Sequence, residues 1–133
     1  MKYGHLRLEI LPQTFKYVLL KDKHSLPLGD ELGPIAMFMG HGEVSAIVPE
    51  TLTTDATAIE SDWACIRVVG EMPFGSVQGL IAKVSAALHA DGLGVCIVST
   101  FKSDWFFVRM KYIERARSAL SADGWEFQSS TVD

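Results

Sequence analysis

The apolar positions of the chain recur with a helical period in one long segment, residues 77–91. Counted from the first of them, they lie at offsets of 0, 3, 4, 7 and 11 residues, which places them on one face of an α-helix. They are Val77, Leu80, Ile81, Val84 and Leu88. Ser76 precedes this stripe, where a hydroxyl can accept a hydrogen bond from a free amide of the first turn. Gly92 follows it, where a left-handed residue often ends a helix. The pattern predicts a helix from Val77 to Asp91 with Ser76 as its N-cap.

Gly79 falls in the first turn of this predicted helix, where glycine costs about 1 kcal/mol relative to alanine. The position allows two interpretations. Either another group approaches the start of the helix closely, or the packing of the helix requires a residue without a side chain.

The first half of the chain carries strand patterns rather than helical ones. Apolar and charged residues alternate at residues 6–10, and apolar or aromatic runs occur at residues 15–20, 35–39 and 44–48. Gly40-His41-Gly42 joins the last two runs and is a hairpin signal. No amphipathic helix longer than two turns is predicted in this half.

Two segments of the first half are predicted to be connections. Residues 21–34 contain two prolines and two glycines and predict a loop. Residues 51–57 are mainly polar and separate two regions of different pattern. We therefore predict two parts, a smaller β-rich part of residues 1–57 and a second part of residues 58–133.

The second half alternates strands and helices. Strands are predicted at residues 63–69, 95–99, 105–110 and 125–127. The first helix falls after the first strand, and a second helix, marked by Ile113, Ala116 and Leu120, ends at Gly124. The resulting order, β-α-β-β-α-β, is the ferredoxin-like arrangement of the α+β class.

This order predicts which loops are neighbours. A right-handed crossover makes strands 63–69 and 95–99 parallel, with the third strand between them. Their carboxyl ends then share one edge of the sheet, which places the loop of residues 70–76 beside the turn of residues 100–104. The free amides at the start of the helix point into this corner and favour a carboxylate or phosphate.

Both faces of the predicted sheet carry apolar side chains, although two helices can cover only one face. The second face is predicted to pack against strands of the first half, a second copy of the chain, or both. Arg67 and Arg109 alternate with apolar residues on that face. They are predicted either to pair with carboxylates or to belong to an interface.

Composition excludes several classes of protein. The formal net charge of −4 provides no basic surface for nucleic acid. No apolar run approaches the roughly 20 residues that span a membrane, so no membrane association is predicted. The N-terminal residues alternate in polarity and do not resemble a signal peptide, so a cytoplasmic location is expected.

The chain offers no recognisable catalytic or metal-binding set. Cys65 and Cys96 lie in apolar strand patterns and are predicted to be small core residues, with a disulfide or redox role as the alternative. The histidines lack the spacing of a metal pair, and they are His5, His24, His41 and His89. Since no nucleophile–base set or phosphate-binding glycine motif is present either, we predict no enzyme activity, metal or cofactor.

Two runs of the second half resemble the ACT domain family: VVGEMPFGSVQGLIAKVSAAL and LGVCIVSTFKSDWFFV. The resemblance covers Glu60 to Trp125 and is strongest to the ACT domains of cytosolic arginine sensors and of aspartate kinase. The first half, with PQTFKYVLL and EVSAIVPE, resembles the degenerate ACT-like half of small stand-alone members. The resemblance implies two ACT-like halves packed together.

The family implies a regulatory module that binds an amino acid and forms a homodimer. In the corner derived above, the loop of residues 72–77 would offer amides to the ligand carboxylate, and Asp104 would pair with its α-amino group. Gly79 would allow close approach, and Thr100 and Phe101 would flank the ligand side chain. The implied ligand residues are Met72, Phe74, Gly75, Ser76, Val77, Gly79, Thr100, Phe101 and Asp104.

Each of these residues also has a purely structural interpretation. Asp104 follows Ser103 in ordinary turn chemistry, Ser76 can be a helix cap, and the glycines can serve the turn and the packing of the helix. Pro73 donates no amide and Phe74 is bulky, which would narrow the loop relative to arginine-binding relatives. The alternative function is a structural dimerisation or protein-interaction module without a ligand.

Overall fold

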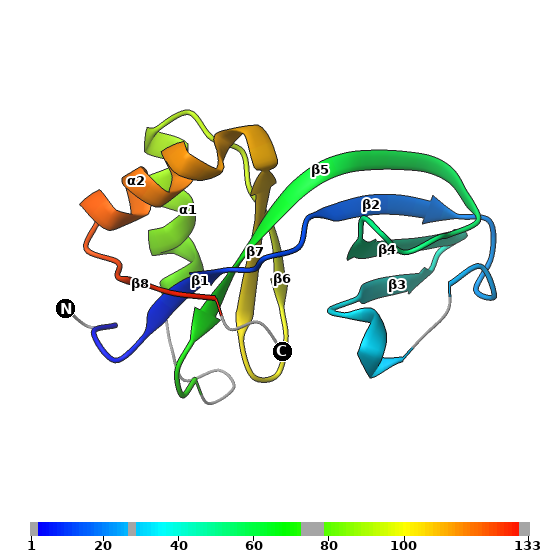
Figure 1. The fold of residues 1–133 in the computed structure, drawn as a ribbon, viewed down its shortest axis with the longest axis horizontal. Helices are drawn as coiled ribbons and strands as arrows, with labels where there is room; N and C mark the ends of the chain where they lie inside the picture. Colours follow the sequence, from blue (N-terminus) through cyan, green and yellow to red (C-terminus); the bar gives the residue numbers. More distant parts are fainter. Residues whose placement is uncertain (1–2, 27–28, 73–78, 131–133) are drawn as a thin grey trace. The chain divides into compact units, whose positions relative to one another are not determined.

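The computed structural model describes residues 3–26, 29–72 and 79–130 (Figure 1). Contacts within the chain divide it into two compact units. The smaller unit is Gln13–Trp63, and the larger unit combines Met1–Pro12 with Ala64–Asp133. The first twelve residues thus pack with the second half of the chain. The expectation that residues 1–57 form a degenerate ACT-like half stays a prediction.

The smaller unit is an antiparallel sheet of four strands in the order β3 (Ala36–Gly40), β4 (Glu43–Pro49), β2 (Phe15–Leu20) and the first part of β5 (Ala56–Val69). This confirms the strands predicted at residues 15–20, 35–39 and 44–48. Its core is a cluster of buried apolar side chains: Val18, Leu20, Leu26, Ala46 and Val48. The predicted loop of residues 21–34 contains one short 3-10 turn, η1 (Asp30–Leu32).

The turn between β3 and β4 confirms the predicted hairpin. His41 (φ 50°) and Gly42 (φ 78°) both adopt left-handed backbone conformations. Two such residues in a two-residue loop form a type I′ turn, whose twist matches that of the strands it joins. β3 lies at the end of the strand order and is an edge strand of the smaller unit.

Strand β5 is longer than predicted, because it begins at Ala56, inside the predicted connector. Opposite β2, two residues of β5 face one residue of β2 between the pairs Tyr17–Glu60 and Phe15–Trp63. Asp62 takes a left-handed conformation in this β-bulge, with φ 66°, and its amide donates a 2.6 Å hydrogen bond to Glu50 Oε1. The bulge lies immediately before the point where β5 passes from the smaller to the larger unit.

The larger unit has the predicted β-α-β-β-α-β order, from β5 to β8. Its further elements are α1 (Leu80–Ala90), β6 (Cys96–Ser99), β7 (Asp104–Arg109), η2 (Met110–Tyr112), α2 (Ile113–Ala122) and β8 (Phe127–Gln128). β7 pairs with both β5 and β6, as the crossover argument requires. Figure 1 shows α1 and α2 on the same side of this sheet. The α+β, ferredoxin-like fold class is therefore confirmed.

One strand of the larger unit comes from the beginning of the chain. β1 (Arg7–Ile10) lies between β5 and β8, antiparallel to β5 and parallel to β8. The first half of the chain thus contributes a strand to the sheet of the second half, a question that the sequence pattern left open.

Helix α1 differs from its prediction at the N-terminal end. It begins at Leu80, three residues later than predicted, and its N-cap is Gly79 with φ 77°. The prediction of Ser76 as the N-cap of α1 is therefore wrong, because Gly79 takes that position, and Ser76 itself lies outside the described residues. The C-terminal prediction is confirmed, since Gly92 has φ 75°.

The core of the larger unit lies between the helices and the sheet. From α1 it includes Leu80, Val84 and Leu88, as the helical stripe predicted, whereas Ile81 is 38% exposed. The strands contribute Leu8, Ala64, Ile66, Val68, Phe106 and Val108, and α2 contributes Ile113, Ala116 and Leu120. The alternate residues of β5 and β7 point to the other face of the sheet.

The two cysteines differ in exposure. Cys65 is fully buried, as predicted, but Cys96 is exposed and its prediction as a core residue is wrong. Cys96 is the first residue of β6, which pairs only with β7, and it lies opposite Phe107 on the face without helices. Both thiols are free.

Candidate functional site

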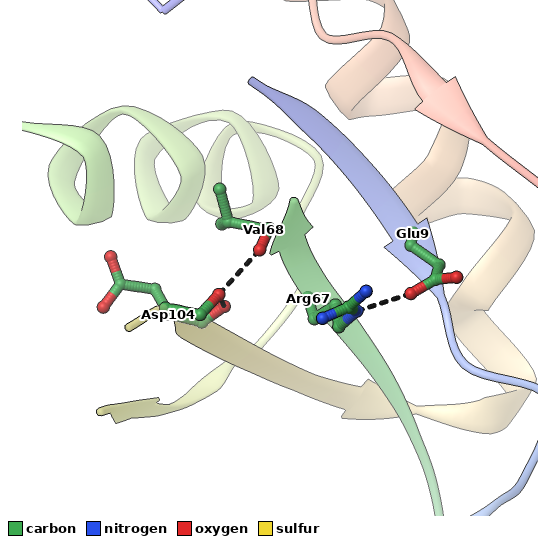
Figure 2. Close-up of polar contacts among 5 residues, drawn as sticks. Glu9, Arg67, Val68 and Asp104 are labelled. Atoms are coloured by element: carbon green, nitrogen blue, oxygen red, sulfur yellow. Dashed lines mark hydrogen bonds and ion pairs between the residues drawn. The ribbon is translucent and has the colours of Figure 1, made fainter. Parts of the chain in front are cut away.

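The carboxyl end of β5 and the turn between β6 and β7 meet at one rim of the larger sheet. The Ser103 hydroxyl donates a 2.6 Å hydrogen bond to the backbone carbonyl of Val68. Figure 2 shows Val68 beside Asp104 at the start of β7. The contact confirms that the turn of residues 100–104 adjoins the end of β5, as the strand order predicted.

The turn itself is held by its own hydrogen bonds. Ser99 pairs with Asp104 at the end of the β6–β7 ladder. The Thr100 amide and hydroxyl both donate to the Ser103 carbonyl, at 2.8 and 3.0 Å. The indole Nε1 of Trp105 donates to Thr100 Oγ1 at 3.0 Å. The Thr100 hydroxyl therefore already has two partners, the Ser103 carbonyl and the Trp105 indole, a structural role that the sequence pattern did not reveal.

Asp104 is a buried acidic residue at this rim, with 7% of its surface exposed. None of the hydrogen bonds and ion pairs between residues that the structure describes uses its carboxylate. Figure 2 shows the carboxylate pointing away from Glu9 and Arg67. A carboxylate with little exposed surface is stabilised by a donor or cation beside it, so a cationic group would be favoured next to this side chain.

Gly79 is the N-cap of α1, the helix that follows β5 in the chain. A Cβ built on it would lie 3.1 Å from the Tyr3 hydroxyl. Tyr3 is itself buried and stacks on Trp125, with ring centroids 5.7 Å apart. Of the two interpretations of Gly79, the structure supports packing, because the close neighbour belongs to the same chain.

The remaining predicted ligand residues fall into two groups. Met72 is half-buried and packs against the core of the larger unit, and the Phe101 side chain is 75% exposed in the turn. The others lie outside the described residues, and they are Phe74, Gly75, Ser76 and Val77. The described part of the site is thus the turn of residues 100–104, Met72 and Gly79.

An ion pair between Arg67 and the buried Glu9 lies on the other face of the sheet. Arg67 Nε donates to Glu9 Oε1 at 2.5 Å, and the Glu9 side chain is only 2% exposed (Figure 2). The two residues face each other across the β1–β5 ladder, and the Arg67 guanidinium lies 5.9 Å from the centroid of the Trp105 ring. This supports the prediction that Arg67 pairs with a carboxylate. Only the pairing of β1 with β5 could have identified Glu9 as its partner.

A cavity of about 480 Å³ lies at the opposite end of the larger sheet from the Val68 rim. β1 runs antiparallel to β5, so Arg7 faces Val69 near the rim and Ile10 faces Ile66 further away. The cavity is lined at that far end by Ile10, Leu11, Pro12, Arg117, Phe127, Gln128, Ser129 and Ser130. Sequence reasoning gave no indication of this cavity.

The described residues contain no group of three or more His, Cys, Asp or Glu side chains that could hold a metal ion. Among the helices of the described part of the chain, none is both long and apolar enough to cross a membrane.

Comparison with known proteins agrees with this architecture. The family model of the ACT domain matches residues 58–122. Residues 58–122 are thus similar in sequence to an ACT domain. The match begins within β5 and ends at the last residue of α2, so β1 and β8 of this sheet lie outside it. None of the curated proteins compared matches the chain in sequence.

Solved structures resemble this chain over nearly its whole length. A protein from Agrobacterium tumefaciens has a TM-score of 0.75 at 20% identity and covers 96% of each chain. A Vibrio cholerae protein of unknown function has a TM-score of 0.67 at 18% identity and covers 91% of each chain. The regulatory subunit of aspartate kinase from Thermus thermophilus, in its ligand-free form, has a TM-score of 0.57 at 10% identity, covering 88% of this chain and 96% of that one. At these low identities, the TM-scores show a shared fold alone.

Proposed function

We propose that the protein is a regulatory module of ACT type that binds an amino acid without catalysing a reaction. The ligand would bind at the rim where the turn of residues 100–104 meets the end of β5, and the family resemblance implies that the loop of residues 72–77 takes part. The observation that carries this proposal is Asp104, a buried carboxylate that takes part in none of the interactions between described residues. The proposal includes the homodimer that the family resemblance implies.

The chemistry of an amino acid matches that of the rim. The α-ammonium group would supply the cation that the Asp104 carboxylate lacks among its described neighbours. Helix α1 begins at Leu80 and directs its first amides toward the end of the sheet where β5 ends. Because a helix N-terminus favours negative charge, it would stabilise the ligand carboxylate. The two ends of a zwitterion would thus be recognised by two different elements.

Isothermal titration against the twenty amino acids is the direct test. We expect at least one of them to bind the wild-type protein. Asp104→Asn keeps the shape of the side chain but removes its charge, and we expect it to weaken that binding by about 10- to 100-fold, since a hydrogen bond to a charged group contributes about 1.5–3 kcal/mol. Arg117→Ala is the matched control, because Arg117 lines the cavity at the opposite end of the sheet. Its affinity is expected to equal that of the wild type.

Three results would contradict the proposal. They are the absence of any heat or thermal shift with all twenty amino acids, an unchanged affinity in Asp104→Asn, and a loss of affinity in Arg117→Ala instead. The last result would move the site to the cavity at the end of β1.

Thermal stability without ligand separates this function from a purely structural one. If the Asp104 carboxylate serves to bind a ligand, Asp104→Asn removes a largely buried charge and is expected to raise the melting temperature of the free protein. If Asp104 holds the fold or a dimer together, the same substitution lowers the melting temperature or dissociates the dimer. The second outcome would favour the alternative of a structural module without a ligand.

A further inference from the structure

Strand β3 of the smaller unit is an exposed apolar edge. It comprises Ala36–Gly40, with the sequence AMFMG, and among the described strands it pairs only with β4. Its three central side chains are among the most exposed large apolar residues described, at 40% for Met37, 58% for Phe38 and 55% for Met39. The devices that usually protect a sheet edge are a charge, a proline or a bulge, and β3 has none of them.

The hairpin fixes which backbone groups of β3 face outward. A two-residue type I′ loop is closed by a hydrogen-bonded pair, which here is Gly40–Glu43. Because antiparallel pairs alternate, Phe38–Ser45 is hydrogen-bonded as well, and Met39–Val44 and Met37–Ala46 are not. The amides and carbonyls of Met37 and Met39 therefore point away from β4. They form an open ladder of two donors and two acceptors.

This open ladder is complementary to itself. When two copies of β3 run antiparallel about a twofold axis at Phe38, Met37 of one copy faces Met39 of the other. Both residues carry outward-facing groups, so this register forms four hydrogen bonds and leaves none of the four outward groups of either strand unpaired. A twofold axis one residue away would pair fewer of them.

The side chains suit the same register. Phe38 would face Phe38 of the second copy in a non-hydrogen-bonded pair, where side chains approach most closely and aromatic pairs are stabilising. The strand carries no charge, so no like charges meet across the axis. On the Phe38 face, the pairing continues an exposed row that runs through Ser45, Leu19 and Ala58, with Leu19 42% exposed.

We propose that two copies of this chain associate through β3, antiparallel and with the twofold axis at Phe38, to join the sheets of their smaller units. The proposal specifies a surface for the homodimer that the proposed function includes. It does not depend on amino-acid binding at the Asp104 rim.

Disulfide trapping tests the register. In a Cys96→Ser background, Phe38→Cys places two thiols on the axis, on strands whose Cα atoms are about 4.5 Å apart, within the range of a disulfide. We expect mild oxidation to link most of the protein into covalent dimers. Met39→Cys is the matched control: it is equally exposed, but it would face position 37 of the second copy, too far from position 39 of that copy for a disulfide. Equal trapping of the two variants, or trapping of neither, would overturn the proposed register.

Charge substitution tests the surface in solution. Phe38→Glu and Phe38→Lys each place like charges opposite each other, and we expect either variant to raise the dimer dissociation constant by more than about tenfold in sedimentation equilibrium. Mixing the two variants is expected to restore the dimer. Leu19→Glu is the control, because Leu19 lies on the same face but two strands inside the edge. A Leu19→Glu variant that dissociates as strongly would indicate face-to-face packing instead.

The outcomes distinguish this inference from the function above. If the wild-type protein is a dimer and both Phe38 variants remain dimeric, pairing through β3 is contradicted but the homodimer itself is not. A wild-type protein that is monomeric contradicts both β3 pairing and the homodimer. In either case, amino-acid binding is decided separately by the titration with Asp104→Asn.

Discussion

The Ser103 hydroxyl donates a hydrogen bond to the main-chain carbonyl of Val68, although 34 positions lie between the two residues in the sequence (Figure 2). Both residues are buried, and their bond of 2.6 Å ties the β6–β7 turn to the end of β5. Asp104 follows Ser103 directly, so this one contact sets where the candidate ligand residue lies relative to β5.

Ser103→Ala is expected to lower the free energy of unfolding by about 1–3 kcal/mol, because it leaves a buried carbonyl without its donor. Urea denaturation provides the measurement. Ser129→Ala, at an exposed serine, is the control and should remain within about 0.5 kcal/mol of the wild type. Equal stability of the two variants would show that the Val68 carbonyl finds another donor.

Gly79→Ala is expected to destabilise the protein by about 1–2 kcal/mol. Alanine at φ 77° bears the steric cost of a left-handed conformation, and its Cβ would lie 3.1 Å from the Tyr3 hydroxyl. Gly94→Ala is the comparison, since no atom lies within 4 Å of its added Cβ, and its stability should be unchanged or slightly higher. A neutral Gly79→Ala would mean that the start of α1 can rearrange.

The Glu9–Arg67 ion pair is expected to contribute far more to the stability of the protein than exposed ion pairs do. Arg67→Met leaves Glu9 buried without this partner and should cost about 3 kcal/mol of stability. The Arg117–Glu114 pair is exposed on both sides, so a double-mutant cycle there should yield a coupling below about 1 kcal/mol. A cost of Arg67→Met below about 1 kcal/mol would show that water reaches Glu9 more freely than its burial indicates.

The two cysteines are expected to differ in reactivity. Burial raises the pKa of the Cys65 thiol above its usual range, which suppresses the reactive thiolate, whereas Cys96 is exposed. A colorimetric thiol reagent should therefore modify one thiol per native chain and two in denaturant. In Cys96→Ser the native protein should not react, and rapid reaction there would reveal opening of β5.

The periodic parts of the chain were the easiest to predict. The spacing of Leu80, Val84 and Leu88 identified the buried face of α1, and the strand order placed the β6–β7 turn beside β5. Both follow from local pattern and the handedness of crossovers, which depend little on distant residues. The predicted start of α1 was wrong because a left-handed glycine at position 79 does not alter the spacing of the apolar residues.

Features that depend on long-range pairing were not predictable. Glu9 has the alternation of an outward-facing residue, and only the pairing of β1 with β5 buries it beside Arg67. Cys96 has the apolar neighbours of a core residue, and its position on an edge strand exposes it. A single sequence specifies which face a side chain occupies but not what covers that face.

The position of β1 has a consequence for how the protein is made. β1 is synthesised first, yet it bonds to β8, so Leu8 pairs with Phe127 across almost the entire chain. The larger unit can complete its sheet only after β8 has been synthesised. Until then β1 lacks one of its two neighbouring strands, so the larger unit is expected to reach its native state only after β8 has emerged, whereas the contiguous smaller unit can fold earlier.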